Sequence, residues 1–159
     1  MLKRILAAGA AAVVLSAAGP ASAQMMSDWL PADVKPILTE TGSRVVAEGN
    51  QPDGQPYIDA VTSRGLKYSV YGEGCDVGPR KRCRGAHLQV IFNMQSAAEA
   101  EKALKSVSYA AVGFSIQEDI KVEGSRYLIL DHGVTRANFK VNVEVFVTIA
   151  HAVWDKLRG

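Results

Sequence analysis

The chain has 159 residues, of which 48% are hydrophobic and 21% charged, and its formal net charge is +2 at pH 7. This length suits one domain, which can bury an adequate core without several disulfides. The positive excess lies in residues 1–23, which carry Lys3 and Arg4 and no acidic residue, so the rest of the chain is neutral. Such a balance argues against a nucleic-acid partner.

Residues 1–23 have the pattern of a secretory signal peptide. A short basic start precedes an apolar run of small residues, Ile5 to Ala18, and Ala21-Ser22-Ala23 is an A-x-A cleavage site. The alternative is an uncleaved anchor, but a membrane span needs about 20 strongly apolar residues and this run is shorter and rich in alanine. We therefore expect cleavage after Ala23, a periplasmic or secreted protein that meets the membrane only during export, and one domain over 24–159.

The first helix is expected soon after the cleavage site. Residues 24–32 predict a lead-in without partners, and Asp33 is a suitable N-cap for a helix of about eight residues. Pro36 would then lie in the first turn, where its missing N–H does no harm. Gly42 is placed to end the helix.

The next part of the chain predicts an antiparallel meander. Short connections rich in turn-forming residues separate four runs with strand signals, namely 44–48, 57–62, 66–71 and 87–94. The last run is the most apolar, so we expect it to be a central strand.

The loop between the third and fourth strands holds Cys75 and Cys83, the only cysteines of the chain. In an oxidising compartment such a pair tends to form a disulfide, and a loop of this size gains roughly 2–3 kcal/mol from it. A metal site would need two more ligands, and His87 is the only histidine nearby. A disulfide is therefore the favoured interpretation, and no metal or cofactor is expected.

Basic residues surround the second cysteine and offer a further interpretation of the loop. The four residues could contact phosphate or carboxylate groups of an anionic partner, and they are Arg80, Lys81, Arg82 and Arg84. The alternative is a solvated loop tip, which is the commoner use of such a run.

The second half of the chain begins with a capping box. Ser96 and Glu99 open a helix, in which Glu101 and Lys105 form an i,i+4 pair. Strands are then expected at 114–122 and 126–131, with a turn at 123–125 between them.

The C-terminal segment fits two patterns. Apolar residues alternate strictly from Phe139 to Ile149, which is typical of a strand, yet they also fit one helical stripe that continues to Leu157. Thr135 is a sound N-cap, and Val134 and Phe139 occupy the positions of a hydrophobic staple. We therefore predict a helix over 136–157.

The order of these elements and two motifs resemble the YbjN-like family of bacterial sensory transduction regulators. The first motif combines Gly74, Cys75 and Cys83 with Leu88 to Phe92, and the second runs from Leu128 to Phe139. The resemblance spans about residues 30–157 and implies an α+β fold of order α-β-β-β-β-α-β-β-α, similar to type III secretion chaperones, with helices packed on one face of a single antiparallel sheet.

The resemblance also implies a non-enzymatic, chaperone-like role in binding another protein, or in binding a second copy as a homodimer. The middle helix departs from the family pattern, because "EKALKSVSYAAVGFS" lacks the tryptophan and asparagine that relatives usually carry there. This departure puts the family's partner surface in doubt for this chain.

Few residues suggest catalysis. Asp131-His132 fits a general base, but a carboxylate before a helix start more often satisfies free N–H groups. Glu118 and Asp119 are adjacent, so in a strand they would point to opposite faces. We expect no catalytic residue; the alternative is a small periplasmic enzyme or ligand-binding protein with a pocket near His132 and the cysteine loop.

Overall fold

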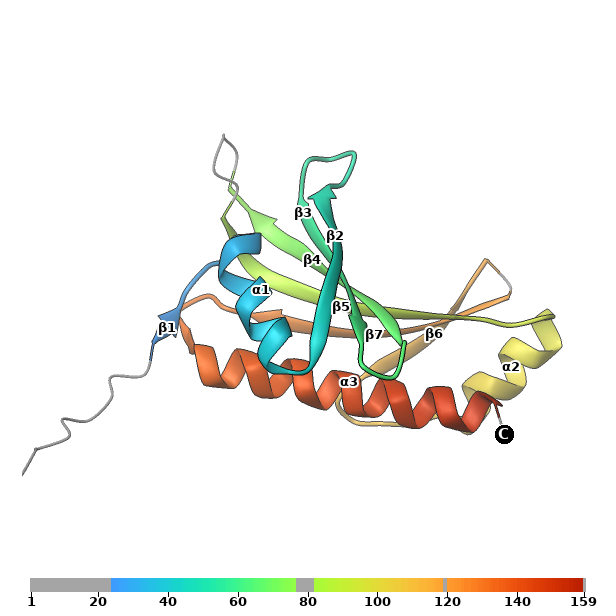
Figure 1. Ribbon diagram of the computed structural model, residues 1–159. Coiled ribbons are helices and arrows are strands. Elements are labelled where there is room, and N and C mark those ends of the chain that lie inside the picture. Colours follow the sequence, from blue (N-terminus) through green and yellow to red (C-terminus); the bar gives the residue numbers. More distant parts are fainter. Residues whose placement is uncertain (1–23, 77–81, 119, 159) are drawn as a thin grey trace, which may run out of the picture.

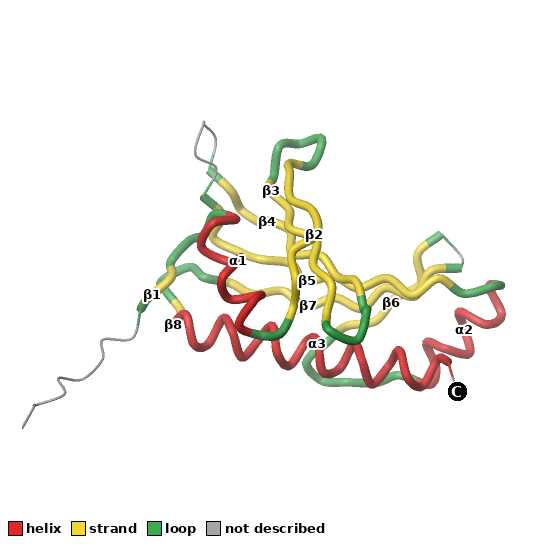
Figure 2. Tube along the Cα trace, viewed as in Figure 1, coloured by secondary structure: helices red, strands yellow, loops and turns green. Residues whose placement is uncertain are grey.

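The computed structural model describes residues 24–76, 82–118 and 120–158, and within them the chain is α+β, with three helices and a six-stranded antiparallel sheet. Figure 1 shows the long helix α3 running along the sheet, with α1 beside its first half and α2 near its C-terminal end. Figure 2 shows the same three helices gathered on one side of the strands. None of the helices in the described residues is long and apolar enough to cross a membrane.

The sheet has the spatial order β2-β3-β4-β5-β7-β6. Its strands are β2 (Ser43–Asn50), β3 (Pro56–Thr62), β4 (Lys67–Cys75), β5 (Cys83–Asn93), β6 (Gly113–Gln117) and β7 (Lys121–Ile129). The prediction of a meander with a central last strand is confirmed, because β2 to β5 pair in sequence and β5 lies between β4 and β7.

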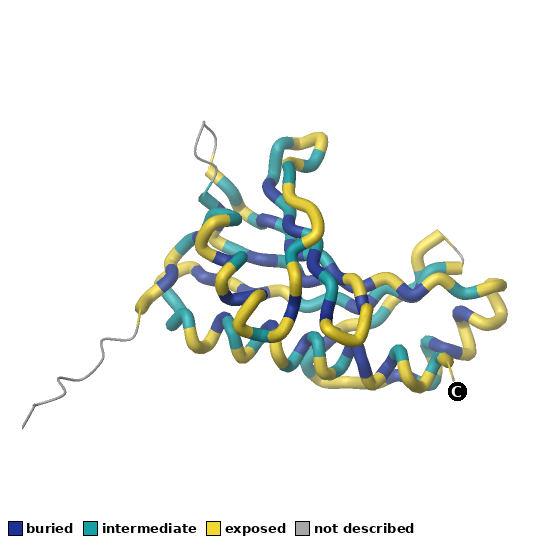
Figure 3. The backbone as a smooth tube through the Cα atoms, in the orientation of Figure 1, coloured by how far each residue is buried: buried dark blue, intermediate teal, exposed yellow. Residues whose placement is uncertain are grey.

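The core lies between the sheet and the helices. Alternate residues of the inner strands are buried, and Figure 3 shows this alternation along the strands above α3. Because side chains alternate between the two faces of a sheet, the buried residues share one face. They pack against one stripe of α3 (Arg136–Arg158), which buries Phe139, Val143, Phe146, Ala150 and Val153. No helix of the described chain covers the other face, which we call the open face.

The prediction of a C-terminal helix is confirmed, and its start has two supports. The hydroxyl of Thr135 accepts a hydrogen bond from the N–H of Asn138 at 3.0 Å, as an N-cap does. The N–H of Arg136 donates to the carbonyl of Gln24 at 2.7 Å. α2 (Ala97–Ser106) also begins as predicted, since Ser96 accepts from the N–H of Glu99 at 3.2 Å.

The prediction that residues 24–32 have no partners is wrong. β1 (Met25–Met26) pairs with β8 (Val134–Thr135), and both short strands are additions to the expected order. Trp29 is fully buried, exchanges two backbone hydrogen bonds with Cys83 at 3.0 Å, and donates its indole N–H to the carbonyl of Gly85 at 2.7 Å. We call residues 24–30 the N-terminal strap.

The predicted N-cap at Asp33 is also wrong, because α1 (Pro31–Glu40) starts three residues earlier with Leu30 as its N-cap. Pro31 sets the first helical turn, and Asp33 lies in that turn, where its carboxylate accepts the N–H of Leu30 at 2.9 Å. Pro36 consequently lies inside the helix. Gly42 ends the segment with a φ of +79°, as predicted.

The predicted turn at 123–125 is wrong, because those residues continue β7 and the chain reverses between Gln117 and Lys121. Glu118 has a φ of +48° in this reversal. Gly124 is needed for close packing: a Cβ there would lie 2.8 Å from the ring of Phe114 and 3.0 Å from Val90. A glycine inside a strand can therefore mark a close approach and not a turn.

Candidate functional site

The open face carries a row of ring-bearing side chains that runs across four strands. The strand register places Tyr57 opposite Tyr71, Tyr71 opposite His87, and His87 opposite Tyr127. Directly opposite residues of antiparallel strands share a face and contact each other. We call these four residues the aromatic row.

Ring geometry shows that the row is a connected series. The centroid distance is 6.4 Å between Tyr57 and Tyr71, 6.1 Å between Tyr71 and His87, and 4.1 Å between His87 and Tyr127. The last two rings are nearly parallel, at 9°, so they stack from strand to strand and stand upright on the sheet. Tyr127 ends the row and is 65% exposed, which leaves one face of its ring open.

His87 lies half-buried within the row. Its Nδ1 lies 3.8 Å from a carboxylate oxygen of Glu73, and its Nε2 is buried with no hydrogen-bond partner in the described residues. Burial lowers the pKa of His87, while the charges of Glu123 and Glu73 oppose that shift. The imidazole is therefore neutral at neutral pH, and the row carries no positive charge.

Polar residues lie in the next row of the open face, about 6.8 Å further along the strands. This row contains Asp59, Ser69, Gln89 and Ser125, and the Ser69 hydroxyl donates to Asp59 at 2.6 Å. On the other side of the aromatic row lie Glu73, Gly85 and Ile129. Among the described residues, two charged side chains lie in the rows directly beside the aromatic row. They are Asp59 and Glu73, and both are acidic.

A shallow hollow of about 270 Å³ lies on this part of the open face. Tyr71 and Ile91 supply apolar walls, and the polar and charged groups of the lining come from Asp59, Lys67, Ser69 and Gln89. Rings, apolar side chains and a few polar groups on one exposed surface suit binding. The Ser69 hydroxyl is hydrogen-bonded to the Asp59 carboxylate here, and the residues that line the hollow include no histidine or cysteine.

The predicted disulfide is confirmed, and Cys75 and Cys83 are bonded across β4 and β5. Gly72 makes room for it: a Cβ there would lie 2.5 Å from Cys83 Sγ and 2.9 Å from Cys75 Sγ. The bond is compatible with an oxidising compartment. Among the described residues, no group of three or more histidine, cysteine or acidic side chains could hold a metal ion.

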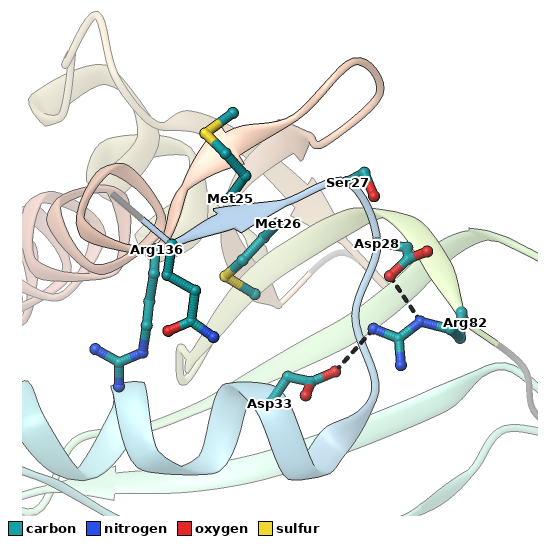
Figure 4. A pocket seen from close by; sticks show the side chains of 8 residues that line it. Met25, Met26, Ser27, Asp28, Asp33, Arg82 and Arg136 are labelled. Atoms are coloured by element: carbon teal, nitrogen blue, oxygen red, sulfur yellow. Dashed lines mark hydrogen bonds and ion pairs between the residues drawn. The ribbon is translucent and has the colours of Figure 1, made fainter. Parts of the chain in front are cut away.

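The structure describes half of the predicted basic contact, since Arg80 and Lys81 lie outside the described residues. Arg82 is engaged within the chain: its guanidinium contacts Asp28 at 2.6 Å and Asp33 at 3.1 Å, beside a polar hollow of about 140 Å³ (Figure 4). The hydrogen bond from Arg82 to Asp28 raises the pKa of the guanidinium further above its usual range. Arg82 thus fastens the N-terminal strap, while the exposed Arg84 lies 3.6 Å from Asp76.

In the described part of the chain, His132 lies on the surface. Its side chain is 96% exposed, 3.9 Å from Asp131, and its backbone φ is +65°. At the start of α3, the N–H of Arg136 donates to Gln24 and the N–H of Asn138 donates to Thr135, so these two groups are satisfied without Asp131. Glu118 lies in a turn and pairs with Lys121, and Asp119 lies outside the described residues.

The aromatic row was not predicted from the sequence, although Tyr57 and Tyr71 both lie within predicted strands. The missing information was the register between strands, which aligns Tyr57, Tyr71, His87 and Tyr127. One part of the row had a signal in the sequence: Tyr57 and Tyr71 lie at similar distances before and after the turn near Gly65, which places them opposite each other in a hairpin. No family model matches the chain, and no curated protein or solved structure matches it.

Proposed function

We propose that the chain is an exported, non-enzymatic binding module that holds a protein segment against the open face of its sheet. The aromatic row is the observation that carries this proposal, because it places four rings in register on a face that no described helix covers. Aromatic side chains are enriched at protein interfaces and dominate their binding energy.

The chemistry of the open face favours a segment with apolar and basic side chains. Asp59 and Glu73 supply negative charge in the rows directly beside the rings, so a cationic side chain is complementary there. The neutral His87 adds no opposing positive charge.

The same proposal includes a chaperone-like type of fold and an exported location. Without the short β1 and β8, the elements follow the order that the YbjN-like resemblance implies, which supports a chaperone-like type. The disulfide and the leader pattern support an exported, periplasmic or secreted location. No described contact favours the alternative of an enzyme or small-ligand pocket around the exposed His132.

Site-specific photo-crosslinking in the exporting cell tests the proposal. A photoreactive residue at Ile91, on the open face, is expected to give one protein adduct, while the same residue at Val141, exposed on α3, gives none. Tyr71→Ala is expected to abolish the Ile91 adduct while the purified variant still melts cooperatively. Equal adducts from Ile91 and Val141, or an adduct that survives Tyr71→Ala, would overturn it.

A further inference from the structure

The outer edge of β7 is left unpaired over its last residues. β6 pairs with β7 only from Lys121 to Ser125, where Gly113 is the last partner. β7 continues beside β5 as far as Ile129. In the described part of the chain, no strand pairs with the outer side of 126–129.

The peptide groups at this edge point away from β5. Leu130 donates its N–H to the carbonyl of Arg84 at 2.7 Å, and the carbonyl of Ile120 accepts the N–H of Met94 at 2.8 Å. The backbone N–H and C=O groups of the even-numbered residues of β7 therefore point toward β5. Those of the odd-numbered residues point away from it, because peptide groups alternate in direction along a strand. The N–H and C=O groups of Tyr127 and Ile129 consequently point outward, where β6 no longer reaches.

The side chains at the same two positions are unusually exposed. Tyr127 is 65% and Ile129 is 77% exposed, more than any other large hydrophobic residue in the described chain. Exposed sheet edges are normally protected by charges, prolines or bulges. β2, at the other end of the sheet, has a bulge between Val45 and Ala47, whereas positions 127–129 carry none of these protections.

We propose that a second copy of the chain pairs with this edge, antiparallel and about a two-fold axis at Leu128. Tyr127 then faces Ile129 of the second copy, and Ile129 faces Tyr127 of the second copy. Because the peptide groups of both residues point outward, each facing pair exchanges two backbone hydrogen bonds. The Tyr127 and Ile129 side chains meet on the open face, so the edge is complementary to itself, as a two-fold interface requires.

On either side of this edge the chain turns away, so it does not occupy the position that a second strand would take. Before β6, the carbonyl of Ala111 accepts a hydrogen bond from Arg126 at 2.5 Å, which holds the chain on the helix side of the sheet. After β7, the N–H of Gly133 donates to the carbonyl of Leu130 at 2.8 Å and closes a turn. Residues 24–159 have no net charge, so two copies do not repel each other overall.

The pairing would join two open faces into one continuous surface. Ile129 of the second copy would extend the aromatic row beyond Tyr127, and the two rows would lie side by side across the axis. This inference goes beyond the proposed function and does not rest on it, because it uses the edge of β7 and not the partner of the open face.

Sedimentation velocity of the purified chain, over a range from about 1 μM to about 1 mM, tests the pairing. The wild type is expected to dimerise, with slower amide exchange at Tyr127 and Ile129 as concentration rises. Ile129→Pro, which removes an outward N–H, and Ile129→Lys, which adds a charge, are both expected to be monomeric. Ile91→Lys, on the open face but away from the edge, is the matched control and is expected to dimerise.

A wild type that stays monomeric over the whole range would overturn the inference, as would a dimer that survives both Ile129 variants or is lost in Ile91→Lys. Circular dichroism shows whether each variant is folded. The photo-crosslink from Ile91 separates the two proposals, since Ile129→Lys is expected to retain that adduct, whereas Tyr71→Ala is expected to lose it and still dimerise.

Discussion

At the scale of single residues, Gly72 decides whether the two cysteines have room to bond. A Cβ at this position would lie 2.5 Å from Cys83 Sγ, which is closer than real Cβ contacts allow. Gly72→Ala is therefore expected to lower the free energy of unfolding by about 1–3 kcal/mol, the usual cost of overpacking. Urea denaturation measures the loss.

Gly113→Ala is the matched control for that variant. Its Cβ would lie 3.9 Å from the nearest atoms, an ordinary contact, so its effect is expected to be well below that of Gly72→Ala. Equal losses of stability in the two variants would show that crowding at the disulfide is not the cause.

His151 illustrates how a buried residue makes stability depend on pH. It lies on α3 with its Nδ1 buried and without a partner among described residues, and burial followed by the charge of Arg64 lowers its pKa, opposed by Asp155. A histidine with a lowered pKa in the folded state binds protons preferentially when unfolded. The free energy of unfolding should therefore fall as the pH drops below about 6.5, the ordinary histidine value.

The test is His151→Gln, which cannot take up a proton. Urea denaturation at several pH values between about 7 and 5 should give a shallower fall in stability for the variant than for the wild type. His87 also has a lowered pKa and remains in the variant, so part of the fall persists. Parallel pH profiles for wild type and variant would contradict the role given to His151.

At the scale of elements, the disulfide and the N-terminal strap act together. Cys83 exchanges two backbone hydrogen bonds with Trp29, and the adjacent Arg82 pairs with Asp28 and Asp33. Replacing both cysteines by serine is expected to lower the free energy of unfolding by about 2–3 kcal/mol. It should also speed amide exchange in residues 24–30 more than in α2, which packs against β6 and β7.

Hydrogen-exchange mass spectrometry of oxidised wild type and the double serine variant makes this comparison. Faster exchange confined to the cysteine loop, with the N-terminal strap unchanged relative to α2, would show that the strap is held without the disulfide.

Elements with local signals were predictable from the sequence, and those held by distant contacts were not. Ser96 and Thr135 correctly predicted the starts of α2 and α3, because an N-cap depends only on residues within one turn of the helix. Trp29 could not be assigned, because its partners Cys83 and Gly85 are more than fifty residues away. Gly124 was wrongly predicted to lie in a turn for a related reason. The ring of Phe114 occupies the space where a side chain would be, and only strand pairing brings Phe114 beside Gly124.

At the scale of the whole molecule, the fold gives the sheet two unlike faces. The helices bury one face, and the other displays the aromatic row with acidic and hydrogen-bonding groups beside it. The sequence predicted the single strands, but the site appears only when four strands are aligned, because it is a property of register. The cysteine pair, by contrast, was predictable because only one pairing exists.

The central claim is that the open face of the sheet is the binding surface. The most direct measurement is the equilibrium affinity of the crosslinked partner segment, as a synthetic peptide, for wild type, Tyr71→Ala and Val141→Ala. Loss of an aromatic hot spot should weaken binding at least about tenfold in Tyr71→Ala, while Val141→Ala, on the exposed side of α3, stays near wild type. Unchanged affinity in Tyr71→Ala, or an equal loss in Val141→Ala, would contradict the claim.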